Sequence, residues 1–143
     1  MCGLPGTGKD TWIREYCPDL PVVSLDEIRR EMKIQPTKAQ GPVAAAAREQ
    51  ARKYLRARRP FVWNAVNLTP DLREKNVRLF EEYGAAVRIV YLETGWEEEL
   101  RRNRERGEIY PDKKIPEQEI ARMLERLMPP ERASAQRVEW IIM

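Results

Sequence analysis

The stretch Gly3-Leu4-Pro5-Gly6-Thr7-Gly8-Lys9 is the most informative part of this chain of 143 residues. Its glycines let a loop turn backbone N–H groups towards an anion without interference from a Cβ atom, and its lysine adds a flexible cation. The spacing matches the first seven positions of the phosphate-binding pattern GxxxxGK[ST]. We expect the loop to bind nucleotide phosphates through Gly3, Gly6, Thr7, Gly8 and Lys9, with Lys9 also acting in catalysis. An ordinary glycine-rich turn is the alternative.

The last position of this pattern departs from the usual residue. Asp10 stands where a Ser or Thr hydroxyl usually binds Mg²⁺, and Thr11 follows one residue later. We expect Asp10 to contact the metal directly or through a water, because a hard cation is the natural neutraliser of an acid beside phosphates. Thr11 is expected among the nucleotide-binding residues. The alternative is that Asp10 turns away and pairs with Arg14, one helical turn later.

The rest of the chain alternates between short runs of β-branched residues and longer amphipathic stretches. Such alternation is typical of a parallel sheet with crossover helices, so we predict a single α/β domain over residues 1–143. The expected strands cover residues 22–25, 61–63, 86–92 and 138–142. The expected helices cover residues 42–58, 70–83, 96–106 and 116–128.

The start of the chain raises a question about the sheet. A phosphate loop of this type follows a buried central strand, but only Met1 and Cys2 precede Gly3. We therefore expect the N-terminal central strand to be missing or truncated in this sequence. We also expect the natural protein to continue upstream with about five or six β-branched or aliphatic residues.

Composition excludes several classes of protein. The chain contains no histidine, so Ser-His triads and His metal sites are excluded, and its two cysteines form no metal-binding spacing. No stretch approaches the roughly 18 to 20 apolar residues of a membrane span, and no signal region is recognisable. We expect a cytoplasmic protein with no membrane partner.

A second candidate site follows the first expected strand, in the sequence Ser24-Leu25-Asp26-Glu27-Ile28-Arg29. Ligands of open α/β sheets gather at the carboxyl ends of the strands, so Asp26 should lie beside the phosphate loop. A carboxylate there could accept a proton from an attacking hydroxyl, and Arg29 could bind an acceptor phosphate from the same helical face. The alternative is a helix-start acid paired with a solvent-exposed arginine.

Together these segments resemble the kinase modules of the P-loop polynucleotide 5′-hydroxyl kinase family, including those of bacterial and phage nucleic-acid repair enzymes. The similar segments are GLPGTGKDTW (3–12), SLDEIRR (24–30), FVWNAVNLTPDLR (61–73) and IVYLE (89–93). The resemblance implies a P-loop kinase fold, with Asp26 as general base and Arg29 as the contact to an acceptor phosphate. The family often has an acid where this chain has Asn64.

The residues after 93 predict a helix with clustered charge. Thr94 to Glu97 has the pattern of a capping box, acids occupy the expected first turn, and Gly107 is the expected end. The resemblance implies a lid over residues 96–115 with an arginine that covers the donor phosphates. Arg101, Arg104 and Arg106 are the candidates; we favour Arg104 for catalysis and assign Arg101 to nucleotide binding. The alternative is that these arginines form i,i+4 pairs with glutamates on a solvated helix.

The helix expected over residues 42–58 carries a basic stripe that ends just beyond it. Arg48, Arg52, Arg56 and Arg59 follow one another at intervals of four, four and three residues. Such a stripe could follow a nucleic-acid backbone, and an ordinary solvent-facing surface is the equal alternative.

These features predict a kinase that requires ATP and Mg²⁺ and transfers the γ-phosphoryl group to the 5′-hydroxyl end of a polynucleotide. Its expected partners are a nucleoside triphosphate donor and a nucleic-acid acceptor, with fusion to or association with other repair domains. One alternative is a small-molecule kinase with a sugar, antibiotic or nucleoside acceptor, since a fold does not determine the acceptor. Another alternative is a non-catalytic nucleotide-binding module.

Overall fold

A computed structural model describes residues 1–35 and 38–143 of the chain. The strands are β1 (Val22–Ser24), β2 (Val62–Asn64), β3 (Arg88–Glu93) and β4 (Arg137–Ile142). The α-helices are α1 (Lys9–Tyr16), α2 (Leu25–Glu31), α3 (Gly41–Arg56), α4 (Pro70–Glu82), α5 (Trp96–Ile109) and α6 (Glu117–Arg126). Two short 3₁₀ helices are η1 (Pro111–Lys113) and η2 (Arg132–Ser134).

The strands form two parallel pairs, β1 with β2 and β3 with β4. The first two residues of the chain lie between these pairs. The Met1 nitrogen donates to the Trp63 carbonyl of β2 at 2.7 Å, and the Cys2 nitrogen donates to the Val90 carbonyl of β3 at 2.8 Å. The Cys2 carbonyl in turn accepts from the Leu92 nitrogen at 2.9 Å, which makes a parallel bridge. The predicted parallel α/β architecture is therefore confirmed, and Met1 and Cys2 hold its central position.

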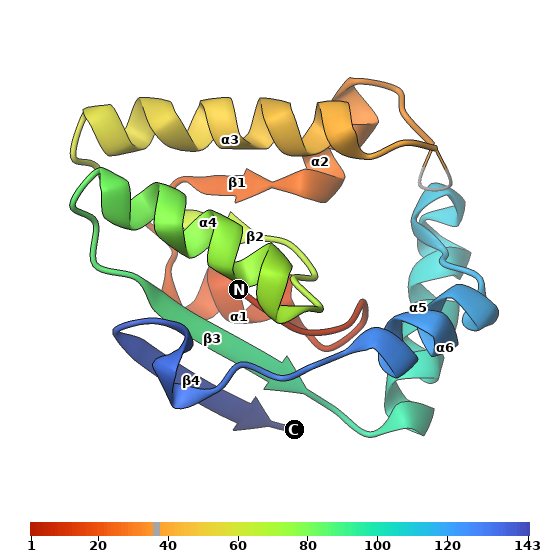
Figure 1. Cartoon of the computed structure of the whole chain (residues 1–143). Helices are drawn as coiled ribbons and strands as arrows, with labels where there is room; N and C mark the ends of the chain where they lie inside the picture. The colour runs from red at the N-terminus through yellow and green to blue at the C-terminus, as the bar shows by residue number, and fades with distance from the viewer. Residues whose placement is uncertain (36–37) are drawn as a thin grey trace.

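Helices cover both faces of the strands. In Figure 1, α4 lies in front of the strands and α1 lies behind them. The main core cluster joins α3 to the first strand pair: small and branched side chains of α3, such as Ala47 and Leu55, pack near Val23 of β1 and Phe80 of α4. The expected helix 42–58 is thus present over Gly41–Arg56 and buries the face that its apolar spacing predicted.

Two local predictions about α5 are wrong. The helix begins at Trp96 with Gly95 as its N-cap, and no side-chain cap hydrogen bond is present, so Thr94 and Glu97 form no capping box. Gly107 lies inside the helix, which continues to Ile109. Within the described residues, no helix combines the length and apolarity that crossing a membrane requires.

Candidate functional site

The loop before α1 has the backbone conformation that its glycines predicted. Gly3, Gly6 and Gly8 have φ angles of 136°, 91° and 90°, which L side chains rarely adopt. Space is also restricted, because a Cβ atom on Gly3 would lie 2.4 Å from the Leu92 carbonyl oxygen. Thr7 is buried, and its hydroxyl donates to the Leu4 carbonyl at 2.8 Å. The loop is therefore a compact turn that only glycine permits at these positions.

The Lys9 side chain turns back into this loop. Its Nζ atom donates to the Gly3 and Leu4 carbonyls at 2.8 and 2.7 Å. Burial lowers the pKa of the Lys9 ammonium, and the carboxylates of Asp10 and then Asp26 offset part of that effect. These two bonds use two of the three N–H donors of the ammonium, so one donor is left for a phosphate oxygen.

Asp10 points across the site to β2. Its Oδ1 atom accepts a hydrogen bond of 2.8 Å from the Asn64 side-chain amide, while Arg14 donates to the Thr11 hydroxyl at 3.4 Å. The described residues show no Asp10–Arg14 pair, which was the alternative. Asp10 is exposed at the first turn of α1, and a single carboxylate suits Mg²⁺ that is bound mainly by phosphates and water. The described residues contain no cluster of three or more possible metal ligands.

Asp26 and Arg29 form the second part of the site, at the carboxyl end of β1. Ser24 caps α2 by accepting from the Glu27 nitrogen at 3.3 Å, which sets the first helical turn. Arg29 NH1 donates to Asp26 Oδ1 at 2.5 Å. The Asp26 side chain is 74% exposed but that of Arg29 only 23%, so this arginine is not the solvent-exposed partner of the alternative interpretation.

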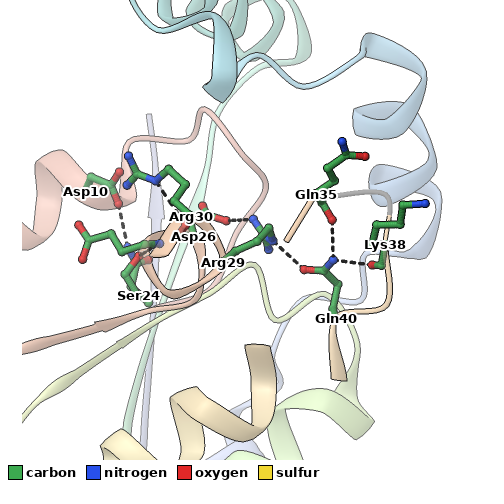
Figure 2. Close-up of polar contacts among 10 residues, drawn as sticks. Asp10, Ser24, Asp26, Arg29, Arg30, Gln35, Lys38 and Gln40 are labelled. Carbon is green, nitrogen blue, oxygen red and sulfur yellow. Dashed lines mark hydrogen bonds and ion pairs between the residues drawn. The ribbon is translucent and has the colours of Figure 1, made fainter. Parts of the chain in front are cut away.

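Arg29 is also held from a second element. Its Nε atom donates to the Gln40 side-chain oxygen at 2.6 Å, and the Gln40 amide donates to the Gln35 and Lys38 carbonyls, as Figure 2 shows. Gln40 is the N-cap residue of α3. Gln40 could not be identified as a site residue from the sequence, because its contact with Arg29 joins residues eleven positions apart and no motif contains it.

The arginines of α5 divide into two groups. Arg101 pairs with Glu98 and Glu105, and Arg104 pairs with Glu117 of α6 at 3.2 Å. The two arginines that we assigned to the site are Arg101 and Arg104. The structure places neither of them at the phosphate loop. Arg102, in contrast, donates to the Gly6 carbonyl at 3.4 Å as well as to Glu98.

Arg106 lies on the same face as Arg102, one turn further along α5. Its positive charge reaches Lys9, where it contributes to the lowered pKa of the ammonium. Arg106 NH2 donates to the Asn103 side-chain oxygen at 3.0 Å, and its Nε atom is buried without a partner among the described residues. Arg102 and Arg106 are therefore the arginines of α5 that approach the loop.

Glu99 is a buried acid at the phosphate loop that belongs to none of the sequence motifs. Its side chain is 2% exposed, and a Cβ atom on Gly6 would lie 3.3 Å from Glu99 Cγ. Burial raises the pKa of the Glu99 carboxyl to about 7, against a smaller opposing effect of Lys9. The helix α5 therefore packs directly on the phosphate loop through an acid whose charged form is disfavoured by burial.

Asn103 fastens the segment that follows α5. This buried side chain donates to the Ile115 carbonyl at 2.7 Å and accepts from the Ile115 nitrogen at 3.2 Å. The carboxyl end of the region predicted as a lid, residues 96–115, is thus tied to the middle of α5 by one amide side chain. This role of Asn103 could not be predicted, because a single polar residue within a stretch of charged residues carries no sequence signal for it.

The basic stripe of α3 is partly neutralised. Glu49 pairs with Arg52 at 3.4 Å and with Arg56 at 3.3 Å. The Arg59 guanidinium lies over the Tyr54 ring, 5.9 Å from its centre. The Gln40 contact places the amino end of α3 beside Arg29, and Arg48 follows about 10 Å further along the helix axis.

Comparison with known proteins identifies the family. A family model described as an AAA domain, AAA_33, matches residues 1–130. A comparison with the curated proteins finds no matching relative. The match spans most of the chain and includes the phosphate loop, the Asp26–Arg29 pair and α5. The chain therefore belongs to the AAA_33 family, a family of P-loop NTPase-like kinases.

Proposed function

We propose that this protein is a polynucleotide 5′-hydroxyl kinase, which transfers the γ-phosphoryl group of ATP to a nucleic-acid end. The observation that carries the proposal is the Asp26–Arg29 pair at the carboxyl end of β1. Asp26 is close enough to Lys9 to raise the pKa of that ammonium, so an acid, an arginine and the phosphate loop share one edge of the sheet. This is the arrangement that phosphoryl transfer to a hydroxyl needs.

The donor would bind at the loop between Gly3 and Lys9. Backbone N–H groups and the start of α1 favour an anion there, and Lys9 supplies a mobile cation. Arg102 and Arg106 approach from α5 and would neutralise charge on the transferring group. Asp10 would hold Mg²⁺, which supplies further charge neutralisation at the phosphates.

The reaction then follows from these positions. The acceptor hydroxyl oxygen forms a bond to the γ-phosphorus while the bond from that phosphorus to the β,γ-bridging oxygen breaks, and ADP leaves with the bonding electrons. The hydroxyl proton passes to the Asp26 carboxylate. Lys9 and the two α5 arginines stabilise the charge that spreads over the equatorial oxygens.

The close contact between Asp26 and Arg29 gives the acceptor phosphate a specific role. In the pair, the Asp26 oxygen that would accept the hydroxyl proton is bound to the Arg29 guanidinium. An acceptor phosphate that binds Arg29 would replace Asp26 as its anion and release this carboxylate. Substrates with a phosphate beside the reacting end would therefore free the group that accepts the proton.

The surface of α3 supports a polymeric acceptor. Its amino end adjoins Arg29 through Gln40, and Figure 1 shows the helix extending from α2 along the strands. The basic residues follow along this helix from Arg48 onwards. Arg48 and Lys53 add positive charge beside the pairs that Glu49 makes. A single strand whose end lies at Asp26 could follow this surface.

The test is incubation of the purified protein with γ-labelled ATP and four acceptors: a 5′-hydroxyl oligonucleotide, the same oligonucleotide already phosphorylated at its 5′ end, a nucleoside, and a panel of small alcohols. We expect label on the first acceptor only. Label on small alcohols but not on the oligonucleotide would reject a polynucleotide acceptor and retain a kinase. Saturable ATP binding without transfer to any acceptor would indicate a non-catalytic module. Lys9→Ala should abolish ATP binding, with the exposed Lys75→Ala of α4 as matched control.

A further inference from the structure

Asn64 ends β2 beside the phosphate loop. The carbonyl of the residue before it accepts from the Met1 nitrogen at 2.7 Å, and two residues after it the Val66 carbonyl accepts from the Gly3 nitrogen at 3.2 Å. The parallel register sets Asn64 opposite Ser24, at the carboxyl end of β1. Asn64 therefore borders both the nucleotide loop and the acceptor side of the proposed site.

The side-chain amide of Asn64 has a protein partner at one end only. Its Nδ2 atom donates to Asp10 Oδ1 at 2.8 Å. Its Oδ1 atom is buried and accepts from none of the residues that the structure describes. Buried polar atoms normally have a hydrogen-bond partner, and where the chain offers none the partner is a water or a ligand. The orphaned oxygen of Asn64 therefore points to a donor that is not part of the chain.

Asp10 is oriented by this amide but not neutralised by it. The hydrogen bond from Asn64 uses Oδ1 and comes from an uncharged group. Within residues 1–35 and 38–143, Asp10 forms no ion pair with a lysine or arginine side chain. Asp10 nevertheless raises the pKa of the Lys9 ammonium, so its charge acts on the phosphate side of the loop. A fixed, exposed carboxylate without a paired cation suits a hard metal ion.

The residue types at these two positions are the reverse of the usual arrangement. In P-loop NTPases a neutral Ser or Thr follows the loop lysine, and an aspartate from another segment completes the Mg²⁺ site. Here the acid, Asp10, follows Lys9, and the neutral residue, Asn64, ends the neighbouring strand. Both arrangements present one carboxylate and one neutral oxygen, so the charge offered to the cation is the same.

We propose that Asp10 and Asn64 form one magnesium-binding unit in which the acid and the neutral residue have exchanged places. Asp10 binds the cation through its carboxylate. Asn64 is a positioning residue: its Nδ2 atom fixes the Asp10 side chain, and its Oδ1 atom accepts from a water of the cation's hydration shell. The proposal rests on the nucleotide site of the proposed function and is independent of the acceptor.

The first experiment measures how much Mg²⁺ strengthens binding of the β,γ-imido analogue of ATP, by isothermal titration calorimetry. The quantity is the Kd without Mg²⁺ divided by the Kd at saturating Mg²⁺, which reports the contribution of the protein to metal binding. Asp10→Ser should lower this ratio at least about tenfold, equivalent to about 1.4 kcal/mol. Asn64→Ala leaves Asp10 available but without its anchor, so the ratio should fall at least about threefold.

The exchange itself is tested by the double variant Asp10→Ser/Asn64→Asp, which restores the usual order of residue types. Its ratio should return to within about threefold of the parent value. The control Asp10→Ser/Gln118→Asp adds the same charge at an exposed position of α6 and should remain as low as Asp10→Ser. The melting temperature of each variant shows whether it is folded.

Nuclear magnetic resonance of the parent protein adds a test that needs no variant. Mg²⁺ added to the protein with bound analogue should shift the side-chain amide resonances of Asn64 and leave those of Gln118 in place. Unshifted Asn64 resonances, an Asn64→Ala ratio equal to that of the parent, or a double variant no better than its Gln118 control would each overturn the proposal and leave the kinase intact. A parent protein that binds no analogue would overturn this proposal together with the proposed function.

Discussion

Arg29 donates to Asp26 at 2.5 Å from one helical turn away, and the same guanidinium is anchored on its other side by Gln40 at 2.6 Å. The two contacts make Arg29 the fixed member of the pair and Asp26, which is largely exposed, the mobile one. A ligand that competes for Arg29 therefore displaces the Asp26 side chain and leaves the arginine in place.

Asp26→Asn should lower kcat by roughly 10² to 10⁴, because the amide keeps the shape and cannot accept the proton. The control is Glu27→Gln, which changes an exposed acid on the same helix and should leave kcat unchanged. In the parent protein, kcat should be higher for a 5′-hydroxyl dinucleotide than for the matching nucleoside, and Arg29→Ala should remove that difference. An undiminished preference in Arg29→Ala would contradict the exchange of anions at Arg29.

Asp10→Ala should raise the Mg²⁺ concentration for half-maximal rate by about tenfold or more, because the metal would lose the protein ligand that we propose for it. Asp10→Ser should restore much of the rate. Asn64→Ala removes the amide that now holds Asp10 at 2.8 Å and should leave the carboxylate available to the metal. The measurement is a Mg²⁺ titration of the rate at saturating ATP. If the Asp10→Ala variant needs the same Mg²⁺ concentration as the parent and differs only in a lower melting temperature, Asp10 acts as a helix-start acid and not as a metal ligand.

Arg102→Ala and Arg106→Ala should each lower kcat at least about tenfold, because these side chains approach the loop and would stabilise charge in the transition state. Arg104→Ala is the matched control, since its partner is Glu117 on α6. The measurement is kcat of each of the three variants at saturating ATP and oligonucleotide. A larger loss in Arg104→Ala than in the other two would return the catalytic role to Arg104 and require α5 to rotate during the reaction.

Glu99 should make the protein less stable as the pH rises. Its carboxyl has a pKa of about 7 in the folded protein, compared with an ordinary value near 4.5. The folded state therefore binds more protons between these values, so the free energy of unfolding falls with increasing pH over this range, by up to about 3 kcal/mol. Glu99→Gln should remove that decline and unfold later than the parent at pH 8.

The Met1 amino group titrates in the opposite sense. Burial lowers its pKa to about 6, so its contribution to stability is lost below that value and present at pH 8. Comparing urea unfolding of parent and Glu99→Gln at each pH cancels this contribution. The exposed Glu97→Gln should follow the parent curve. Parallel curves for the parent and Glu99→Gln would show that the carboxyl is charged in the folded state.

Much of the fold follows from the sequence because local patterns and tertiary structure agree there. The glycine spacing of residues 3–8 produces the positive φ angles, and the apolar face of α3 is the buried face. The three-residue interval of Asp26 and Arg29 produces their contact. In each case the determining interaction is made within a few residues or by one periodic face.

The features that could not be predicted from the sequence depend on contacts between elements that are distant in the chain. Glu99 follows two other glutamates and has the pattern of a solvated first turn, but packing of α5 on Gly6 buries it. Arg102, which was not among the candidate arginines, donates to the Gly6 carbonyl, whereas Arg104, two positions later and on the opposite side of the helix, pairs with Glu117. Gly107 does not end α5, since the Lys114 side chain packs against it and the helix continues to Ile109.

The position of Met1 and Cys2 between β2 and β3 also bears on the cooperativity of unfolding. One core cluster surrounds β1, β2 and α3, and a second, smaller cluster contains Cys2, Ile89 and Tyr91. The helix α4 contributes Phe80 to the first cluster and Val77 to the second. With so few residues shared, the strand pair β3–β4 can separate from the rest at lower cost than full unfolding. The calorimetric enthalpy of melting should then exceed the van't Hoff enthalpy.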